Sequence, residues 1–370
     1  MLPRSRRFLL LLFAAAGLAF FIYKSRNSVS IEGFHWAMLA RSLRDVRLGL
    51  LALGVVAIYG CFALRALRWM QFSRVLGATH FWNVYSATLM GFTCTFLLGR
   101  PGEPIRPMLI ATKDSIPVSR MFGVYVLERV FDMAAAAVLA CAGLLLFKSG
   151  ELMAEGSARA MAIARSAGAL LLVLLLVAVA FLCFFRYRGG AWLAGTLQRE
   201  TWRTGWRKKV VALLEGFGEG LQGIRTWGDL GALLGYTAAH WLLVVLVYWW
   251  VAYAFGGRLA QIGFPGATLA LAFTLVGSAA QLPGAGGGAQ AATFFVYWQI
   301  FGVQRETALV AAVVMWLVTF VSCSLVGVPL LLREGWSVGE LRQMARREEA
   351  AGPATLLSGG EGENLQRRSR

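Results

Sequence analysis

The chain has 370 residues, of which 58% are hydrophobic and 15% are charged, against about 25% charged in a typical soluble domain. Its formal net charge is +17, and its apolar residues form long runs instead of the alternating stripes of a soluble fold. This composition excludes a secreted disulfide scaffold, a collagen-like chain, a disordered chain and a soluble nucleotide-binding enzyme. It predicts an all-α, polytopic integral membrane protein.

Six apolar runs are predicted to cross the membrane, because each can span most or all of a ~30 Å hydrocarbon core at ~1.5 Å per residue. In chain order they are 8–23, 48–64, 121–147, 166–185, 230–255 and 308–332. The first run resembles a signal peptide, with a basic start. However, the bulky residues 20–23 stand where a small-residue cleavage site belongs, so we expect an uncleaved first helix.

Two further apolar stretches end in runs of Pro and Gly. Residues 81–98 lead into 99–107, and residues 264–282 lead into 283–290 and a short apolar piece that ends at Phe301. Broken backbone at membrane depth is tolerated only where it is buried in protein or lines a wet cavity. We therefore predict two re-entrant hairpins that enter from opposite sides, as in transporters whose sites form where such elements meet.

The basic residues support this topology. With the N-terminus inside, the inner segments hold 25 Lys and Arg and the outer segments hold 10. The exception is 24–47, an expected amphipathic surface helix with five basic residues outside. Residues 1–335 are predicted to form the transmembrane domain, with an amphipathic cytoplasmic insertion at 186–226. Residues 336–370 are expected to form a short, partly disordered cytoplasmic tail.

Several kinds of chemistry are not expected. The basic residues lie in short connections between apolar runs, which argues against nucleic-acid binding. The five cysteines lack CxxC spacing, so neither disulfides nor a metal site are predicted. The chain has three histidines and no catalytic triad, zinc-protease or nucleotide-binding pattern. We expect no cofactor and no enzymatic activity.

Six charged residues lie in segments predicted to enter the bilayer. On insertion scales, a charged side chain at the centre of a membrane helix costs about 2.5–3.5 kcal/mol. Arg100, Glu103 and Arg106 lie in the first hairpin, and Glu128, Arg129 and Asp132 lie in the crossing 121–147. The last three share a helix face by their spacing, and the six charges sum to zero. They either neutralise one another to hold the hairpin or form a site for a lipid phosphate. We favour the second interpretation, because buried ion pairs seldom stabilise a fold more than apolar packing does, and guanidinium groups bind phosphate well.

A second set of residues has alternative interpretations. The predicted crossing 48–64 is followed directly by Arg65, Arg68 and Trp69. These residues indicate either anchoring at the membrane interface or capture of a lipid head group. His240 is expected to be a hydrogen-bonded core histidine in preference to a proton relay. In the second hairpin, the segment that includes Pro283, Gly286, Gly287 and Gly288 exposes backbone N–H groups suited to an anion, and Gln290 is its one polar side chain.

The order of these motifs resembles the lysylphosphatidylglycerol synthase transmembrane (flippase-like) family, which includes the membrane half of the bacterial multiple peptide resistance factor. The resemblance covers about residues 5–335 and is carried by RALRW at 65–69, GRPGEPIR at 99–106, ERVFD at 128–132 and the Pro-Gly hairpin. It implies a lipid-handling protein of a bacterial or archaeal cytoplasmic membrane, with both termini cytoplasmic. By motif match, it also implies that the six charged residues above form the functional cluster.

Two departures from the family pattern limit this comparison. Gln290 stands where the family often carries a glutamate after its glycines, which removes an acid. The soluble lysyl-transferring domain is absent, so the chain is expected not to synthesise lysylphosphatidylglycerol itself.

Three functional hypotheses follow. The leading one is a flippase or transporter of an anionic or phosphate-bearing lipid, either a phospholipid or a polyprenyl phosphate. The second is a non-catalytic membrane scaffold for a separate glycosyl- or aminoacyl-transferase, which would dock on 186–226. The third is a proton-coupled carrier of a small solute.

Overall fold

A computed structural model of the protein describes most of the predicted membrane domain. The described residues are 44–74, 76–146, 226–278, 281–282 and 286–335, together with the single positions 166, 169, 173, 176, 177 and 180. The predictions for 8–23, 24–43, 186–225 and 336–370 lie outside these residues, as do Pro283 and most of the crossing 166–185.

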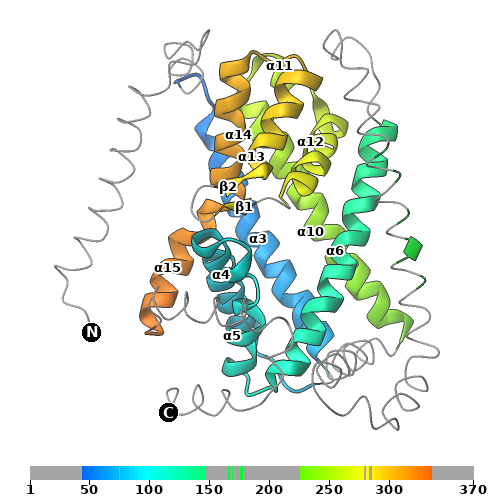
Figure 1. Ribbon diagram of the computed structural model, residues 1–370, viewed down its shortest axis with the longest axis vertical. Coiled ribbons are helices and arrows are strands. Elements are labelled where there is room, and N and C mark those ends of the chain that lie inside the picture. The colour runs from blue at the N-terminus through cyan, green and yellow to red at the C-terminus, as the bar shows by residue number, and fades with distance from the viewer. Residues whose placement is uncertain are drawn as a thin grey trace, which may run out of the picture.

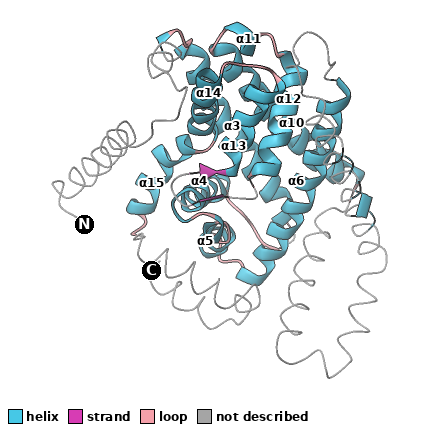
Figure 2. Ribbon diagram, turned by 45° about the horizontal axis from the view of Figure 1, so that its top comes forward, coloured by secondary structure: helices cyan, strands magenta, loops and turns pink. Residues whose placement is uncertain are grey.

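Almost all regular structure in the described part of the chain is helical, as predicted (Figure 2). The longer helices are α3 (Leu48–Ser73), α4 (Phe81–Leu98), α5 (Ile105–Lys113), α6 (Val118–Leu146), α10 (Trp227–Ala254), α12 (Gly263–Gly277), α13 (Gly288–Phe295), α14 (Arg305–Thr319) and α15 (Ser324–Arg333). Short helical turns are η1 (Arg100–Gly102), α11 (Gly257–Ala260), η4 (Val296–Ile300) and η5 (Val321–Cys323). The strands β1 (Gln281–Leu282) and β2 (Gly286–Gly287) form one antiparallel pair.

Three helical segments are long and apolar enough to cross a membrane: α3, α10 and the segment Arg305–Arg333, with 26, 28 and 29 residues. They confirm membrane-length apolar helices at three of the predicted crossings. A fourth predicted crossing, 121–147, is the single 29-residue helix α6. Helix α3 extends beyond the predicted crossing 48–64, since it continues to Ser73 and carries its two arginines within the helix.

The segment Arg305–Arg333 is interrupted, although its sequence predicts one crossing. Helix α14 ends at Thr319, and η5 precedes α15. Two local side-chain bonds accompany the break: the Ser322 hydroxyl donates to the Val318 carbonyl at 2.6 Å, and the Cys323 thiol donates to the Phe320 carbonyl at 2.8 Å. Side-chain groups that bond nearby carbonyls compete with regular helix geometry, and these two bonds lie at the interruption.

The two broken stretches occupy opposite halves of the molecule. In Figure 1, α4 and α5 lie in the lower half, α12 and α13 lie in the upper half, and the β1–β2 pair lies between them. In each stretch the chain doubles back at a glycine that admits no side chain. A Cβ on Gly102 would lie 2.4 Å from the Cys94 carbonyl oxygen, and one on Gly277 would lie 2.3 Å from the Gly288 oxygen. The glycines therefore permit backbone contacts that a larger residue would block.

Candidate functional site

Two buried carboxylates on α6 form the centre of the candidate site. Glu128 is fully buried and Asp132 is 9% exposed. They are four residues apart on a helix, so both lie on one side of α6, where both accept hydrogen bonds from α3. Four arginines from three helices surround them: Arg65 and Arg68 on α3, Arg106 on α5, and Arg129 on α6 itself. We call these six residues the arginine–carboxylate cluster.

The two α3 arginines each bridge both carboxylates. Arg65 Nη1 donates to Glu128 Oε1 at 2.9 Å and to Asp132 Oδ2 at 3.2 Å. Arg68 Nη2 donates to Glu128 Oε1 at 3.1 Å and to Asp132 Oδ1 at 2.7 Å. The spacing of three residues places both guanidinium groups on one face of α3, so a single helix supplies two cations to the same acids.

Arg106 attaches the first broken stretch to the cluster. Its guanidinium group donates to both carboxylate oxygens of Glu128. The same group lies over the rings of Trp69, Phe92 and Tyr125, at 4.8, 5.6 and 5.8 Å from their centroids. Cation–π contacts of this kind stabilise a guanidinium group whose water has been removed. Trp69 is fully buried, so it serves as a packing partner of Arg106.

The interfacial interpretation of Arg65, Arg68 and Trp69 is wrong. These residues are 6%, 1% and 0% exposed, and the two arginines belong to the cluster that was predicted without them. Their inclusion changes the charge balance, since four arginines now face two carboxylates. The cluster holds a formal surplus of two positive charges instead of the zero predicted for the six residues of the sequence motifs. That surplus favours an anionic ligand.

Arg129 is held less tightly than the other three arginines. Its Nη2 lies 3.5 Å from Glu128 Oε2 and 3.6 Å from Asp132 Oδ2, and its side chain is 40% exposed. Its guanidinium group lies over the Tyr125 ring at 5.2 Å. Because exposed, longer ion pairs contribute little energy, Arg129 is the member of the cluster that can most readily exchange its partner for an incoming anion.

Arg100 and Glu103 form a looser pair beside the cluster, at 3.9 Å. The Tyr125 hydroxyl donates to Glu103 Oε2 at 2.8 Å, which ties the pair to α6. Arg100 Nη2 also donates to the backbone oxygen of Ser278, at the end of α12, at 3.2 Å. This last bond joins the two broken stretches.

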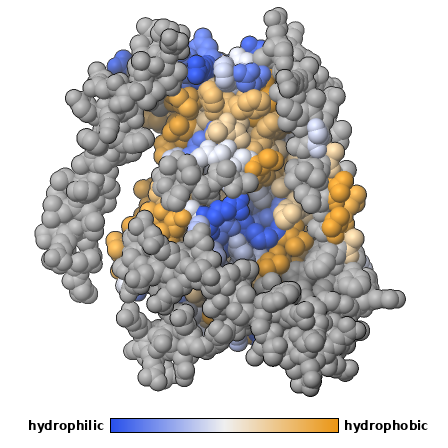
Figure 3. Space-filling model, in the orientation of Figure 1, coloured by the Kyte–Doolittle hydropathy of each residue, from blue (hydrophilic) through white to orange (hydrophobic). Residues whose placement is uncertain are grey.

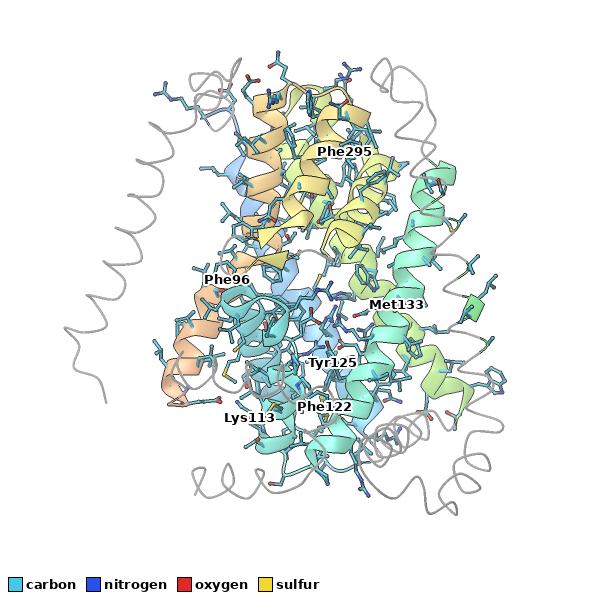
Figure 4. The ribbon with its side chains drawn as sticks, viewed as in Figure 1. Phe96, Lys113, Phe122, Tyr125, Met133 and Phe295 are labelled. Carbon is cyan, nitrogen blue, oxygen red and sulfur yellow. The ribbon has the colours of Figure 1, made fainter. Side chains whose placement is uncertain are left out.

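A cavity of about 470 Å³ lies where the two broken stretches meet. Its charged lining consists of Arg65, Arg100, Glu103, Arg106, Arg129 and Asp132. Its apolar lining includes Phe62, Phe92, Trp241, Leu271, Trp316 and Phe320. Figure 3 shows hydrophilic residues at mid-height between hydrophobic ones on one face, and Figure 4 shows Tyr125 and Met133 on α6 beside this region. The site is therefore amphipathic, with charge at one part of an otherwise apolar wall.

Several side chains of the cluster and cavity have donor capacity left over. Among the described residues, the Nε atoms of Arg65, Arg68 and Arg129 and the Nε1 atom of Trp241 are buried without a hydrogen-bond partner. Each of these nitrogens can only donate. A buried donor without a partner is costly, so the arrangement is suited to a ligand that supplies acceptor oxygens.

His240 is a hydrogen-bonded core residue, in agreement with the preferred prediction. Its Nδ1 lies 3.2 Å from the Cys61 carbonyl oxygen, and its Nε2 lies 3.2 Å from Arg65 Nη2. A guanidinium nitrogen can only donate, so Nε2 accepts and Nδ1 carries the proton that it donates to Cys61. The ring is thus neutral and positions Arg65.

The second broken stretch has a structural role that was not predicted. Gln290 Oε1 accepts the backbone N–H of Gly287 at 2.6 Å and so caps the start of α13. The expectation that Gly287 offers its N–H to an anion is wrong, because that N–H is already bound. Gly287 has φ 131°, a conformation open to glycine and rarely to other residues. Gly286 pairs with Leu282, and Gln290 lines the cavity.

The sequence analysis missed the aromatic part of the site. Phe92, Tyr125 and Trp241 carry no charge and lie in apolar runs, where nothing in the sequence separates a cavity wall from a packed core. The available signal was spacing, since Tyr125 precedes Glu128 by three residues and Arg129 by four and so shares their helix face.

The chain belongs to the lysylphosphatidylglycerol synthase transmembrane family. The family model described as the lysylphosphatidylglycerol synthase TM region matches residues 8–327, which is most of the chain. This confirms the resemblance read from the motifs. No curated protein and no solved structure matches the chain.

Proposed function

We propose that this member of the family is a lipid transporter, a flippase for an anionic or phosphate-bearing lipid such as a phospholipid or a polyprenyl phosphate. One observation carries the proposal: a cluster of four arginines and two carboxylates borders, through three of its arginines and Asp132, a cavity whose remaining walls are largely apolar. A lipid head group with a phosphate would balance the surplus charge, and guanidinium groups bind phosphate oxygens through paired N–H bonds.

Head-group binding would proceed by exchange of partners. The carboxylates of Glu128 and Asp132 hold the arginines in place through ion pairs. A phosphate that reaches Arg129 takes over a guanidinium group whose ion pairs are long and partly exposed. The same phosphate then accepts from Arg65 and Arg106, the other two arginines of the cluster that line the cavity. The acids keep the cluster assembled between substrates, so we assign them a positioning role and the arginines the binding role.

The proposed setting is the cytoplasmic membrane of a bacterium or archaeon, with both termini in the cytoplasm. We propose six crossings and two re-entrant hairpins, with the hairpins formed by α4–α5 and by α12–α13. Support comes from the excess of basic residues in the inner segments and from the opposite halves of the fold that the two stretches occupy (Figure 1).

We also propose that the chain is not an enzyme, because both buried carboxylates are engaged by arginines and so are poorly placed to act as a general base.

The test is lipid translocation in proteoliposomes, with phosphatidylglycerol and polyprenyl phosphate as separate substrates. The variants are Arg106→Ala and Glu103→Gln, and the control is Arg74→Ala. Arg74 directly follows α3, its side chain is 69% exposed, and it pairs with Asp229 at 3.4 Å away from the cavity. We expect wild-type protein and Arg74→Ala to move one of these lipids, and Arg106→Ala to lose at least tenfold in rate.

Folding must be verified for each variant by its helical circular dichroism and its elution as a single species. Equal translocation by folded Arg106→Ala and wild type would contradict the assignment of the cluster. Absence of movement with either lipid, in folded wild-type protein, would contradict the transport proposal. That result would favour the scaffold hypothesis. This hypothesis predicts that charge reversal at 207–209 disrupts the complex, so that a transferase can no longer be cross-linked to the protein.

A further inference from the structure

Helices α6 and α12 pack closely at one level and both line the cavity at another. They meet at Gly143, where a Cβ would lie 3.0 Å from the Leu269 backbone nitrogen. Seven residues, or ~10 Å, from this contact along each helix lie Ala136 and Val276. Both residues line the cavity. Below their contact the two helices therefore both border the cavity that Arg129 also lines, and we call the space between these wall residues the gap.

The rim of this gap is apolar and faces outward. Met133 on α6 and Val276 on α12 line the cavity and are also 48% and 52% exposed. Ala136 and Leu275, which also line the cavity, complete the rim. A residue that belongs both to a cavity wall and to the outer surface marks an opening. Figure 4 shows Met133 on α6 beside the charged region. Because the rim belongs to a membrane-embedded protein and carries no charge, it is suited to contact with hydrocarbon.

The size of the cavity decides which part of a lipid it can hold. A volume of about 470 Å³ lies within the range of about 300–1,000 Å³ that is typical of clefts for one small ligand. That space accommodates a phosphate with a small polar group. It does not also accommodate the hydrocarbon chains, because each chain extends across about half of a ~30 Å core. A bound lipid must therefore keep its chains outside the cavity, and the chains need a continuous path from the head group to the bilayer.

We propose that the gap bounded by Met133, Ala136, Leu275 and Val276 is a side opening through which the head group enters and beside which the chains remain in the bilayer. The inference rests on the proposed function and extends it to the substrate class. The protein selects the phosphate-bearing head group at the arginine–carboxylate cluster and is indifferent to chain length. Arg129, the most exposed arginine of the cluster, lies one helical turn from Met133 on α6 and meets the phosphate first.

The opening is tested without transport by photolabelling in nanodiscs. Two probes carry the same photoreactive acyl chains: a phosphatidylglycerol and a diacylglycerol that lacks the phosphate. Adducts are mapped by mass spectrometry at Met133 and Val276 and compared with those at Val138. Val138 is a matched control, since it lies on α6, is 57% exposed and does not line the cavity. We expect the ratio of rim to control adducts to be at least fivefold higher with the phosphatidylglycerol probe. Equal ratios for the two probes would overturn the side opening.

Measurement of lipid translocation distinguishes a failure of the proposed side opening from a failure of the proposed transport function. Val276→Trp narrows the gap, and Val138→Trp places the same bulk on the outer face of α6. We expect at least a tenfold loss of rate in Val276→Trp alone, and wild-type rates within twofold for short- and long-chain phosphatidylglycerol. Equal rates in the two variants would overturn the opening while lipid movement by wild type still supports transport. Rim-selective labelling without movement by wild type would keep the opening as a binding route and reject transport.

Discussion

The charge balance of the cluster makes a direct prediction about stability. Removal of an acid should cost far more than removal of the exposed arginine. Glu128→Gln leaves four arginines with one carboxylate, so the formal surplus rises from two to three positive charges. Glu128 accepts bonds from Arg65, Arg68 and Arg106 at full burial. Loss of one partner from a buried ion pair typically costs about 3–5 kcal/mol, and we expect that loss of unfolding free energy here.

Arg129→Gln provides the contrast within the same cluster. This change lowers the surplus to one, and it removes ion pairs of 3.5 and 3.6 Å from a side chain that is 40% exposed. Exposed pairs contribute about 0–1 kcal/mol, so the expected loss of unfolding free energy is in that range. The predicted difference between the two variants is therefore about 2 kcal/mol or more, with Glu128→Gln the less stable.

The assay is reversible unfolding of both variants and wild type in mixed micelles, followed by circular dichroism. Wild-type stability measured in the same micelles provides the reference for both changes. The reasoning would be refuted if Arg129→Gln lost as much stability as Glu128→Gln. That outcome would mean that the cluster is balanced by charges other than those counted here, and the argument for an anionic ligand would lose its basis.

Three further predictions address the supporting contacts. Gly102→Ala forces a Cβ to within 2.4 Å of the Cys94 oxygen and should destabilise the protein by about 1–3 kcal/mol in the same assay, whereas Gly231→Ala, with no atom within 4 Å, should be neutral or stabilising. Arg106→Lys keeps the charge but loses the paired bonds to Glu128, so lipid translocation should fall about tenfold; retention of the full rate would show that a point charge suffices. Tyr125→Phe keeps the ring beneath Arg129 and removes the bond to Glu103, so it should cost about 0.5–1.5 kcal/mol of stability, and a larger loss would indicate a second role for the hydroxyl.

The membrane character of the fold was readable because hydropathy is a property of consecutive residues. Long apolar runs at 48–64, 230–255 and 308–332 predicted membrane-length helices, and the structure has helical segments of that length at all three, the last of them interrupted. The acids of α6 were equally visible, because a charged residue within such a run has no interpretation as an ordinary surface residue. Helix ends were less predictable. Helix α3 runs past Leu64 because Arg65 and Arg68 find buried partners, which the local sequence does not reveal.

By itself, the sequence determined the class of protein, the family, the positions of the helix-breaking glycines and four of the six residues of the arginine–carboxylate cluster. Only the tertiary structure showed that the net charge of the cluster is positive. Whether Arg65 and Arg68 lie at a membrane interface or beside Glu128 depends on how α3 packs against α6, over a sequence separation of about sixty residues. The tertiary structure also decided that Gln290 caps a helix and that residues of both α6 and α12 line the cavity. Burial and charge balance arise from contacts between distant segments, so no local pattern encodes them.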